Sequence, residues 1–158
     1  LITSQLNLER LALVNHGPVE ELYKNVLKLA ATTKINNDQY LTDLSWVKNN
    51  FAQVYSGIEA LKLICWKQTW IMESGHLNMA EASVAKVYGS EFFIQAYRLL
   101  MEIMGELSLL KNDSELSILN AKLERMYRTA SILTFGGGTN EVQRDIIAMA
   151  GLLMPRTR

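Results

Sequence analysis

A run of three glycines, Gly136 to Gly138, leads into Thr-Asn-Glu near the carboxyl end of the chain. Glycines followed by a capping residue such as Thr139 leave backbone N–H groups and the positive end of a helix dipole exposed. Such an end can hold a phosphate or an acyl oxygen. The alternative is a flexible turn without a ligand. The run is neither a Walker loop nor a Rossmann fingerprint, because no hydrophobic strand and crossover unit surround it.

Glu9 is the second candidate for chemistry, because it lies among leucines in Leu-Glu-Arg-Leu on an apolar helical pattern. Desolvation there would make its carboxylate the stronger base that proton removal from carbon requires. The competing interpretation is an exposed glutamate beside Arg10 on the solvated face of a helix. The residues alone leave both interpretations open.

Composition and charge exclude several other classes of function. A single cysteine, Cys65, excludes an internal disulfide, and with only His16 and His76 beside it we expect no metal site. Sixteen basic and sixteen acidic residues argue against a nucleic-acid binder. The longest apolar run, from Ile146 to Met154, is too short to span a bilayer, so we expect a soluble, cytoplasmic chain without membrane insertion.

Helical periodicity accounts for most of the chain, because apolar residues recur every three to four positions and only two prolines occur. The break at Gly17 and Pro18 allows one bent helix or two stacked ones. The pattern predicts an all-α antiparallel bundle, with a strand signal only at 132–135. The apolar stripes of the predicted helices run over 6–29, 46–71, 84–103, 116–132 and from 139 or 140 onward, and the main predicted loop is 31–40. Thr42 or Asp43 is the expected cap of the second helix, which Gly75 and His76 close.

Two local expectations accompany these stretches. Asn78 followed three residues later by Glu81 predicts a capping box at the start of the third stretch. The methionines and most aromatic side chains fall on the apolar stripes, so we predict that they lie in the core. This prediction includes Trp46, Trp66 and Trp70.

Three segments resemble one family. Residues 132–148, Ile-Leu-Thr-Phe-Gly-Gly-Gly-Thr-Asn-Glu-Val-Gln-Arg-Asp-Ile-Ile-Ala, closely resemble the carboxy-terminal signature of flavin-dependent acyl-CoA dehydrogenases. Residues 6–10 are similar to the start of the first helix of that family's carboxy-terminal domain, and residues 124–128 resemble its Glu-Arg-x-Tyr-Arg element. The resemblance implies that residues 1–158 form this carboxy-terminal domain, a four-helix bundle with an extra C-terminal helix.

The resemblance also implies an activity, the α,β-dehydrogenation of an acyl-CoA thioester with FAD as cofactor. In that reaction a glutamate takes the α proton while the β hydride passes to flavin N5. In much of the family the glutamate directly precedes the Gly-Thr pair, where this chain has Gly137, and a glycine cannot be a base. In the isovaleryl and long-chain branches the base lies on the first helix, at the position of Glu9.

By this resemblance the functional residues fall into three groups. Glu9 is the catalytic base, Arg10 and Gly137 position the base or the substrate, and Gly138, Thr139 and Glu141 contact the flavin.

Two segments depart from the family pattern. The family usually has Arg-x-x-Phe-Gly in the first interhelical loop and a glutamine with a glycine-rich turn after the third helix, and both contact the FAD of a neighbouring subunit. Residues 33–37 and 102–107 stand in these places, and a glutamate near a pyrophosphate would be repelled. We therefore expect that this chain does not complete its neighbour's flavin site. The pattern resembles actinobacterial acyl-CoA dehydrogenases built from two different subunits, which often handle steroid-side-chain thioesters.

The resemblance sets the expected partners, which are an acyl-CoA substrate, homologous subunits in a homo- or heterotetramer, and an electron-transfer flavoprotein as electron acceptor. We expect a bacterial, cytoplasmic enzyme. The family's amino-terminal helical domain and middle β domain are absent from these 158 residues, so we expect an inactive fragment. The alternative is a non-catalytic helical assembly subunit of a heteromeric acyl-CoA dehydrogenase.

Overall fold

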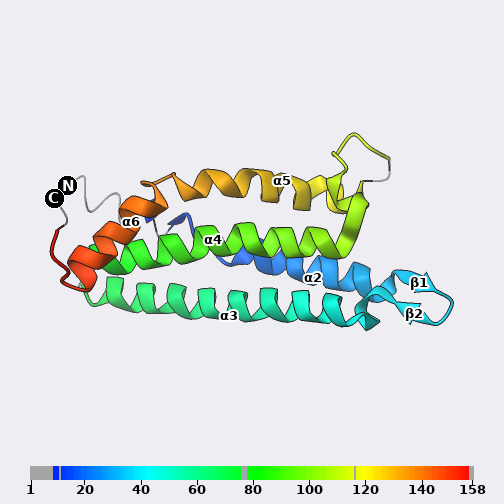
Figure 1. Cartoon of the computed structure of the whole chain (residues 1–158), viewed down its shortest axis with the longest axis horizontal. Coiled ribbons are helices and arrows are strands. Elements are labelled where there is room, and N and C mark those ends of the chain that lie inside the picture. The colour runs from blue at the N-terminus through cyan, green and yellow to red at the C-terminus, as the bar shows by residue number, and fades with distance from the viewer. Residues whose placement is uncertain (1–8, 11, 76–77, 116, 157–158) are drawn as a thin grey trace. The chain divides into compact units, whose positions relative to one another are not determined.

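The computed structural model describes residues 9–10, 12–75, 78–115 and 117–156, which are mainly α-helical (Figure 1). The all-α prediction is confirmed. The α-helices are α2 (Gly17–Thr32), α3 (Ser45–Glu73), α4 (Met79–Met104), α5 (Lys122–Ala130) and α6 (Asn140–Ile146), and the strands are β1 (Lys34–Asn36) and β2 (Gln39–Tyr40). None of the described helices combines the length and apolarity needed to cross a membrane.

The chain folds as two compact units. The first unit comprises Leu1–Asn15, Ala60–Phe92 and Ala130–Arg158, and the second comprises His16–Glu59 and Phe93–Thr129. Helices α3 and α4 therefore each contribute one half to either unit. The first unit contains every candidate residue of the catalytic and flavin sites.

The second unit has an apolar core built from α2, the first half of α3 and the second half of α4. On α2 the buried side chains follow helical spacing at Val19, Leu22, Val26 and Ala30. The Tyr23 ring meets Phe51 of α3 edge to face, with 5.6 Å between ring centroids. On α4 the apolar side chains Ala96, Tyr97, Leu99, Leu100 and Ile103 are buried.

The core of the first unit depends on a close approach between the amino-terminal segment and α4. Val14 is buried, and a Cβ placed on Gly89 of α4 would lie 2.5 Å from its Cγ1 atom. The Cys65 thiol on α3 donates a hydrogen bond to the Val14 carbonyl, with 3.4 Å between the two atoms. Only a glycine at position 89 lets Val14 lie this close to the helix.

The break at Gly17 and Pro18 separates two helical segments. Residues 9, 10 and 12 are helical, the backbone leaves the helix at 13–16, and α2 starts at Gly17 with Pro18 in its first turn. Proline suits that place because the first N–H groups of a helix have no intrahelical partner. Residues 1–8, which include the start of the family-like segment 6–10, lie outside the described residues.

Three further boundaries differ from the predictions. The predicted loop 31–40 contains the end of α2 and the β1–β2 hairpin. The predicted strand at 132–135 is wrong, since Ser131–Thr134 form a 3-10 turn. The predicted helix 116–132 is shortened to α5, because Leu119, Asn120 and Ala121 have left-handed backbone angles that no α-helix can contain.

The capping prediction at Asn78 is half confirmed. Its side-chain Oδ1 accepts a hydrogen bond from the Ala80 N–H over 2.8 Å. Glu81 binds Lys67 of α3, with 3.0 Å between the ammonium and each carboxylate oxygen. The start of α4 is therefore fixed to α3 as well as capped.

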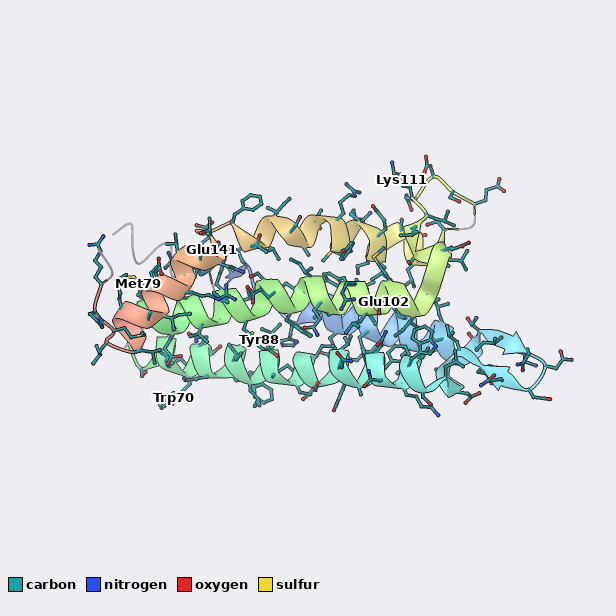
Figure 2. All side chains as sticks on the ribbon, viewed as in Figure 1. Trp70, Met79, Tyr88, Glu102, Lys111 and Glu141 are labelled. Carbon is teal, nitrogen blue, oxygen red and sulfur yellow. The ribbon has the colours of Figure 1, made fainter. Side chains whose placement is uncertain are left out.

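The prediction that the three tryptophans lie in the core is wrong. Trp46, Trp66 and Trp70 are 46%, 65% and 69% exposed, and Trp70 projects outward from α3 (Figure 2). The buried stripe of α3 runs instead through Val47, Phe51, Val54, Ile58 and Leu61. Trp66 and Trp70 are four residues apart, and with Leu63 they form an exposed apolar surface on one face of α3 in the first unit.

Candidate active site

The glycine turn between the 3-10 turn Ser131–Thr134 and α6 is the centre of the site. Gly137 and Gly138 have positive φ angles of 69° and 100°, which other residues rarely adopt. The Gly138 N–H closes the turn onto the Phe135 carbonyl over 3.1 Å. Helix α6 then starts with Thr139 as its cap, since the Thr139 hydroxyl accepts from the Val142 N–H over 3.3 Å.

Arg10 reaches the turn from the other end of the chain. Its Nε donates to the Gly137 carbonyl over 3.1 Å, across 127 residues of sequence. The side chain is only 6% exposed, and burial lowers the pKa of its guanidinium while the neighbouring charge of Glu9 acts in the opposite direction. The predicted pair of positioning residues, Arg10 and Gly137, is thus in contact.

Glu9 is exposed in the structure, and its backbone is helical, with the Leu13 N–H donating to its carbonyl over 3.1 Å. The described residues of this chain therefore do not bury its carboxylate. The exposed position matches the second of the two interpretations of the sequence. Any desolvation of Glu9 has to come from a group that binds over it.

Lys86 of α4 is fully buried beneath the turn. Its Nζ donates to the carbonyls of Thr134 and Gly138 over 3.0 and 2.8 Å and to Asn140 Oδ1 over 2.6 Å. Burial lowers the pKa of its ammonium, and the charge of Arg10 lowers it further, whereas Glu141 and Glu91 oppose both effects.

Two buried amides of α6 link the turn to α4. Gln143 accepts a hydrogen bond from the Ser83 hydroxyl over 2.8 Å and donates one to the Gly137 carbonyl over 3.3 Å. Asn140 donates to Glu91 Oε1 over 3.1 Å, and that carboxylate also pairs with Arg144, which lies 2.6 Å away. The inner side of the turn is therefore a connected polar network.

The three predicted flavin contacts lie on the opposite, exposed side. Gly138, Thr139 and Glu141 are exposed, while Asn140 and Gln143 are buried. Figure 2 places Glu141 at the start of α6. Its pKa is lowered mainly by a hydrogen bond with its own backbone N–H and then by the Thr139 hydroxyl. The segment therefore presents one polar edge outward and holds the other edge against α4.

Comparison with known proteins identifies the chain. A family model described as "Acyl-CoA dehydrogenase, C-terminal domain" matches residues 1–152. The chain belongs to this family. It is 46% identical over 160 residues to the acyl-CoA dehydrogenase FadE26 of Mycobacterium tuberculosis, covering 99% of this chain and 40% of that protein.

Solved structures of the family agree in fold. The ChsE4-ChsE5 complex from Mycobacterium tuberculosis matches with a TM-score of 0.89 and 45% identity, over 99% of this chain and 40% of the matched chain. The Tcur3481-Tcur3483 steroid ACAD matches with a TM-score of 0.89 and 36% identity, over 99% and 39% of the two chains. The chain thus spans about two-fifths of the length of these relatives.

Members of the acyl-CoA dehydrogenase family are FAD-dependent, and the exposed edge of the turn fits contact with such a group. Gly138 and Thr139 are exposed at this edge, and Thr139 offers a hydroxyl. The turn's carbonyls at 137 and 138 are already bonded on the inner side. Among the described residues, no group of three or more His, Cys, Asp and Glu could hold a metal ion.

Sequence reasoning missed the buried half of this site. The apolar pattern indicates no role for Lys86, although Ser83, Lys86 and Ser90 follow one another at spacings of three and four residues. That spacing places three polar residues on one face of α4, and all three are buried. The apolar stripe predicted for α4 starts at Val84, which is 38% exposed, whereas Phe92, Leu99 and Ile103 further along it are buried as predicted.

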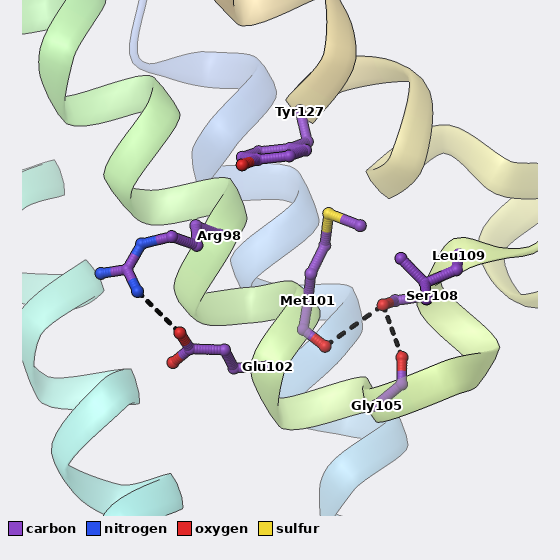
Figure 3. A pocket seen from close by; sticks show the side chains of 7 residues that line it. All are labelled: Arg98, Met101, Glu102, Gly105, Ser108, Leu109 and Tyr127. Atoms are coloured by element: carbon purple, nitrogen blue, oxygen red, sulfur yellow. Dashed lines mark hydrogen bonds and ion pairs between the residues drawn. The ribbon is translucent and has the colours of Figure 1, made fainter.

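The segment that departs from the family pattern, residues 102–107, borders a separate pocket in the second unit (Figure 3). The pocket has a volume of about 260 Å³. Glu102 on its wall pairs with Arg98 over 2.7 Å and accepts from Asn50 over 3.2 Å. The Ser108 hydroxyl donates to the carbonyls of Gly105 and Met101. The carboxylate that would repel a pyrophosphate is therefore held in place.

Proposed function

We propose that this chain is the C-terminal domain of an FAD-dependent acyl-CoA dehydrogenase and supplies the catalytic base, Glu9. The contact between Arg10 and Gly137 carries the proposal. Gly137 holds the place where much of the family has its glutamate, and Glu9 is the neighbour of the residue that touches it. A base on the first helix and a base in the turn would therefore serve the same small region.

In this proposal the Glu9 carboxylate accepts the α proton of an acyl-CoA thioester. FAD, when bound, supplies the acceptor for the β hydride. Exposure of Glu9 in this chain suits the role, because a bound acyl group would exclude water from the carboxylate and strengthen it as a base. The hydrogen bond from Arg10 to the Gly137 carbonyl holds this part of the amino-terminal segment beside the turn.

Gly138, Thr139 and Glu141 form the flavin-contacting edge in this proposal, supported by their shared exposure. The substrate class is an acyl-CoA thioester with a bulky, steroid-like acyl part. Support for that class comes from the 36% identical steroid ACAD.

Homologous acyl-CoA dehydrogenase subunits are the proposed partners, with an electron-transfer flavoprotein as the acceptor of electrons. The exposed surface of Leu63, Trp66 and Trp70 on α3 supports subunit association, because large exposed apolar patches mark protein interfaces. The departure of residues 102–107 from the family pattern supports a further part of the proposal, that this chain leaves its neighbour's flavin site incomplete.

The test is Glu9→Gln in the full-length protein purified with its partner subunit. We expect flavin reduction by acyl-CoA to slow by about 10²–10⁴-fold with the flavin content unchanged, because amide nitrogen and oxygen cannot accept the proton. Glu73→Gln, at the exposed end of α3, is the matched control and should leave the rate unchanged. Undiminished reduction in Glu9→Gln would show that Glu9 is not the base.

The same preparation tests the alternative of a non-catalytic assembly subunit. A yellow complex with one flavin for each pair of subunits supports the enzyme. A colourless complex that forms normally and buries Glu9 against the partner would replace the proposal with the assembly role.

A further inference from the structure

Lys86 is buried, and its ammonium makes three hydrogen bonds at the glycine turn. A lysine ammonium has three N–H donors, and Lys86 has three acceptors within 3.0 Å: the Thr134 and Gly138 carbonyls and Asn140 Oδ1. These acceptors bracket the glycine turn, with one before it, one at its last glycine and one at the first residue of α6. The ammonium thus ties both ends of the turn to a single point on α4.

The charge itself has a cost. Burial of an ammonium is unfavourable unless its hydrogen bonds are complete, and the like charge of Arg10 adds to the cost at Lys86. An apolar side chain of similar length would fill the same space without this cost. The three directed hydrogen bonds are what distinguish lysine from such a side chain.

The turn is a segment that needs outside support. Gly137 and Gly138 have left-handed φ angles and no side chains, so nothing on these residues selects one conformation over others. Their carbonyls are held by Lys86, Arg10 and Gln143, which all act from the inner side. The outer side of the turn is thereby left to Gly138 and Thr139, the exposed residues.

We propose that Lys86 is a positioning residue for the flavin site: its buried ammonium holds residues 134–140 in the one conformation that presents Gly138 and Thr139 to the flavin. The part of this proposal that concerns the flavin rests on the proposed function, while the part that concerns the turn does not. Lys86 touches neither substrate nor cofactor in this role and acts only through the turn.

Lys86→Met in the full-length protein with its partner subunit is the test. Methionine retains the length and removes the charge and all three donors. We expect amide hydrogen exchange in peptides covering 134–144 to become about tenfold faster or more, because the turn can open without breaking the core. FAD added back to the deflavinated protein should bind about tenfold more weakly, since part of the binding energy must order the turn.

Two control variants separate this role from general support of the fold. Lys67→Met removes an ammonium from the same unit that binds Glu81 on the surface. Ala82→Gly weakens α4 one turn before Lys86 at a fully buried position. Both should leave the exchange of 134–144 and the dissociation constant for FAD within about twofold of wild type.

The outcomes distinguish the proposal from the function on which it partly rests. The positioning role would be overturned if the amide hydrogen exchange rate of 134–144 in Lys86→Met stays within twofold of wild type. It would also be overturned if Ala82→Gly accelerates that exchange as much as Lys86→Met does. Faster exchange with no FAD binding even in the wild type would reject the proposed function and leave the role in the turn standing. Should Lys86→Met fail to fold, Lys86→Arg retains the charge but cannot match the three acceptors, and failure of both variants to fold would overturn the proposal.

Discussion

Arg10 Nε donates to the Gly137 carbonyl over 3.1 Å, which joins the amino-terminal helical segment to the turn that starts α6. This hydrogen bond links the first helix and the turn, the two segments in which, by the family resemblance, different branches carry the catalytic base. The glutamate at the turn position is absent here, and Glu9 is covalently attached to the residue that makes the contact. In the proposed function, a base on either segment would serve the region around this contact.

The first prediction concerns moving the carboxylate from position 9 to position 137. Gly137→Glu in the Glu9→Gln background should restore flavin reduction to about tenfold above the Glu9→Gln variant, because it returns a carboxylate to the same region. Recovery should be incomplete, since φ at this position is 69° and a Cβ there would lie 3.4 Å from Arg10 Cγ. Gly137→Gln in the same background is the control and should restore nothing. Equal rates in the Glu and Gln variants would contradict the shared location of the two bases.

The sequence singles out the exposed candidate residues of the turn but not the buried Lys86 beneath it, for a physical reason. Gly138, Thr139 and Glu141 belong to one contiguous motif, so their proximity follows from the chain itself. The contacts of Lys86 with Gly138 and Asn140 span more than fifty residues and depend on how α4 is rotated about its axis. The apolar pattern alone placed exposed Val84 inward and left Lys86 without a role.

The prediction that the tryptophans lie in the core is wrong for a related reason. Trp66 and Trp70 lie next to the buried stripe of α3, and hydrophobic periodicity cannot separate a core face from a face that meets another subunit. The helices α3 and α4, by contrast, were predicted well because their patterns are long. The hairpin at 34–40 escaped prediction because β1 and β2 comprise only three and two residues.

Removal of the Arg10 guanidinium should weaken the first unit. Arg10→Met should lower the free energy of unfolding of the intact protein by about 1–3 kcal/mol in urea denaturation, because a buried charged hydrogen bond is lost from the Gly137 carbonyl. Arg98→Met removes a solvent-exposed pair with Glu102 and should cost less than about 1 kcal/mol. Equal losses in the two variants would show that the buried contact has no special weight.

The close approach of Val14 to Gly89 predicts that a glycine-to-alanine change at this helical position lowers the free energy of unfolding instead of raising it. Glycine-to-alanine changes inside helices usually stabilise, but Gly89→Ala should destabilise the intact protein by about 1–3 kcal/mol through overpacking. The added Cβ would lie 2.5 Å from Val14 Cγ1 and 2.7 Å from Val14 Cβ. Val14→Ala in the same chain removes the nearer atom, so the double variant should lose less stability than the sum of the single variants. Additive losses would show that Val14 does not cause the effect.

The exposed surface on α3 should control assembly. Trp66→Ser with Trp70→Ser should shift the full-length protein with its proposed partner subunit to smaller species in native mass spectrometry, because the proposed interface would lose two side chains that are more than 60% exposed in this chain. Leu109→Ser changes a side chain that is 64% exposed after α4 in the other unit and serves as the matched control. An unchanged assembly mass in the double variant would exclude this surface from the interface.

The last prediction is the alkaline behaviour of Tyr97, which is 2% exposed and whose pKa is raised by burial to about 12. The unfolded chain ionises near the ordinary value of 10.0, so between these two values the unfolded state loses its proton first. The contribution of Tyr97 to stability is therefore complete below about pH 10 and is lost as the pH rises toward 12, by about 2–3 kcal/mol in total. Tyr97→Phe lacks the titrating group but retains the ring that stacks on Phe93. The difference in free energy of unfolding between wild type and Tyr97→Phe should be constant below about pH 9 and should then move in favour of Tyr97→Phe, whereas a difference independent of pH would show that Tyr97 ionises in the folded protein as readily as in the unfolded chain.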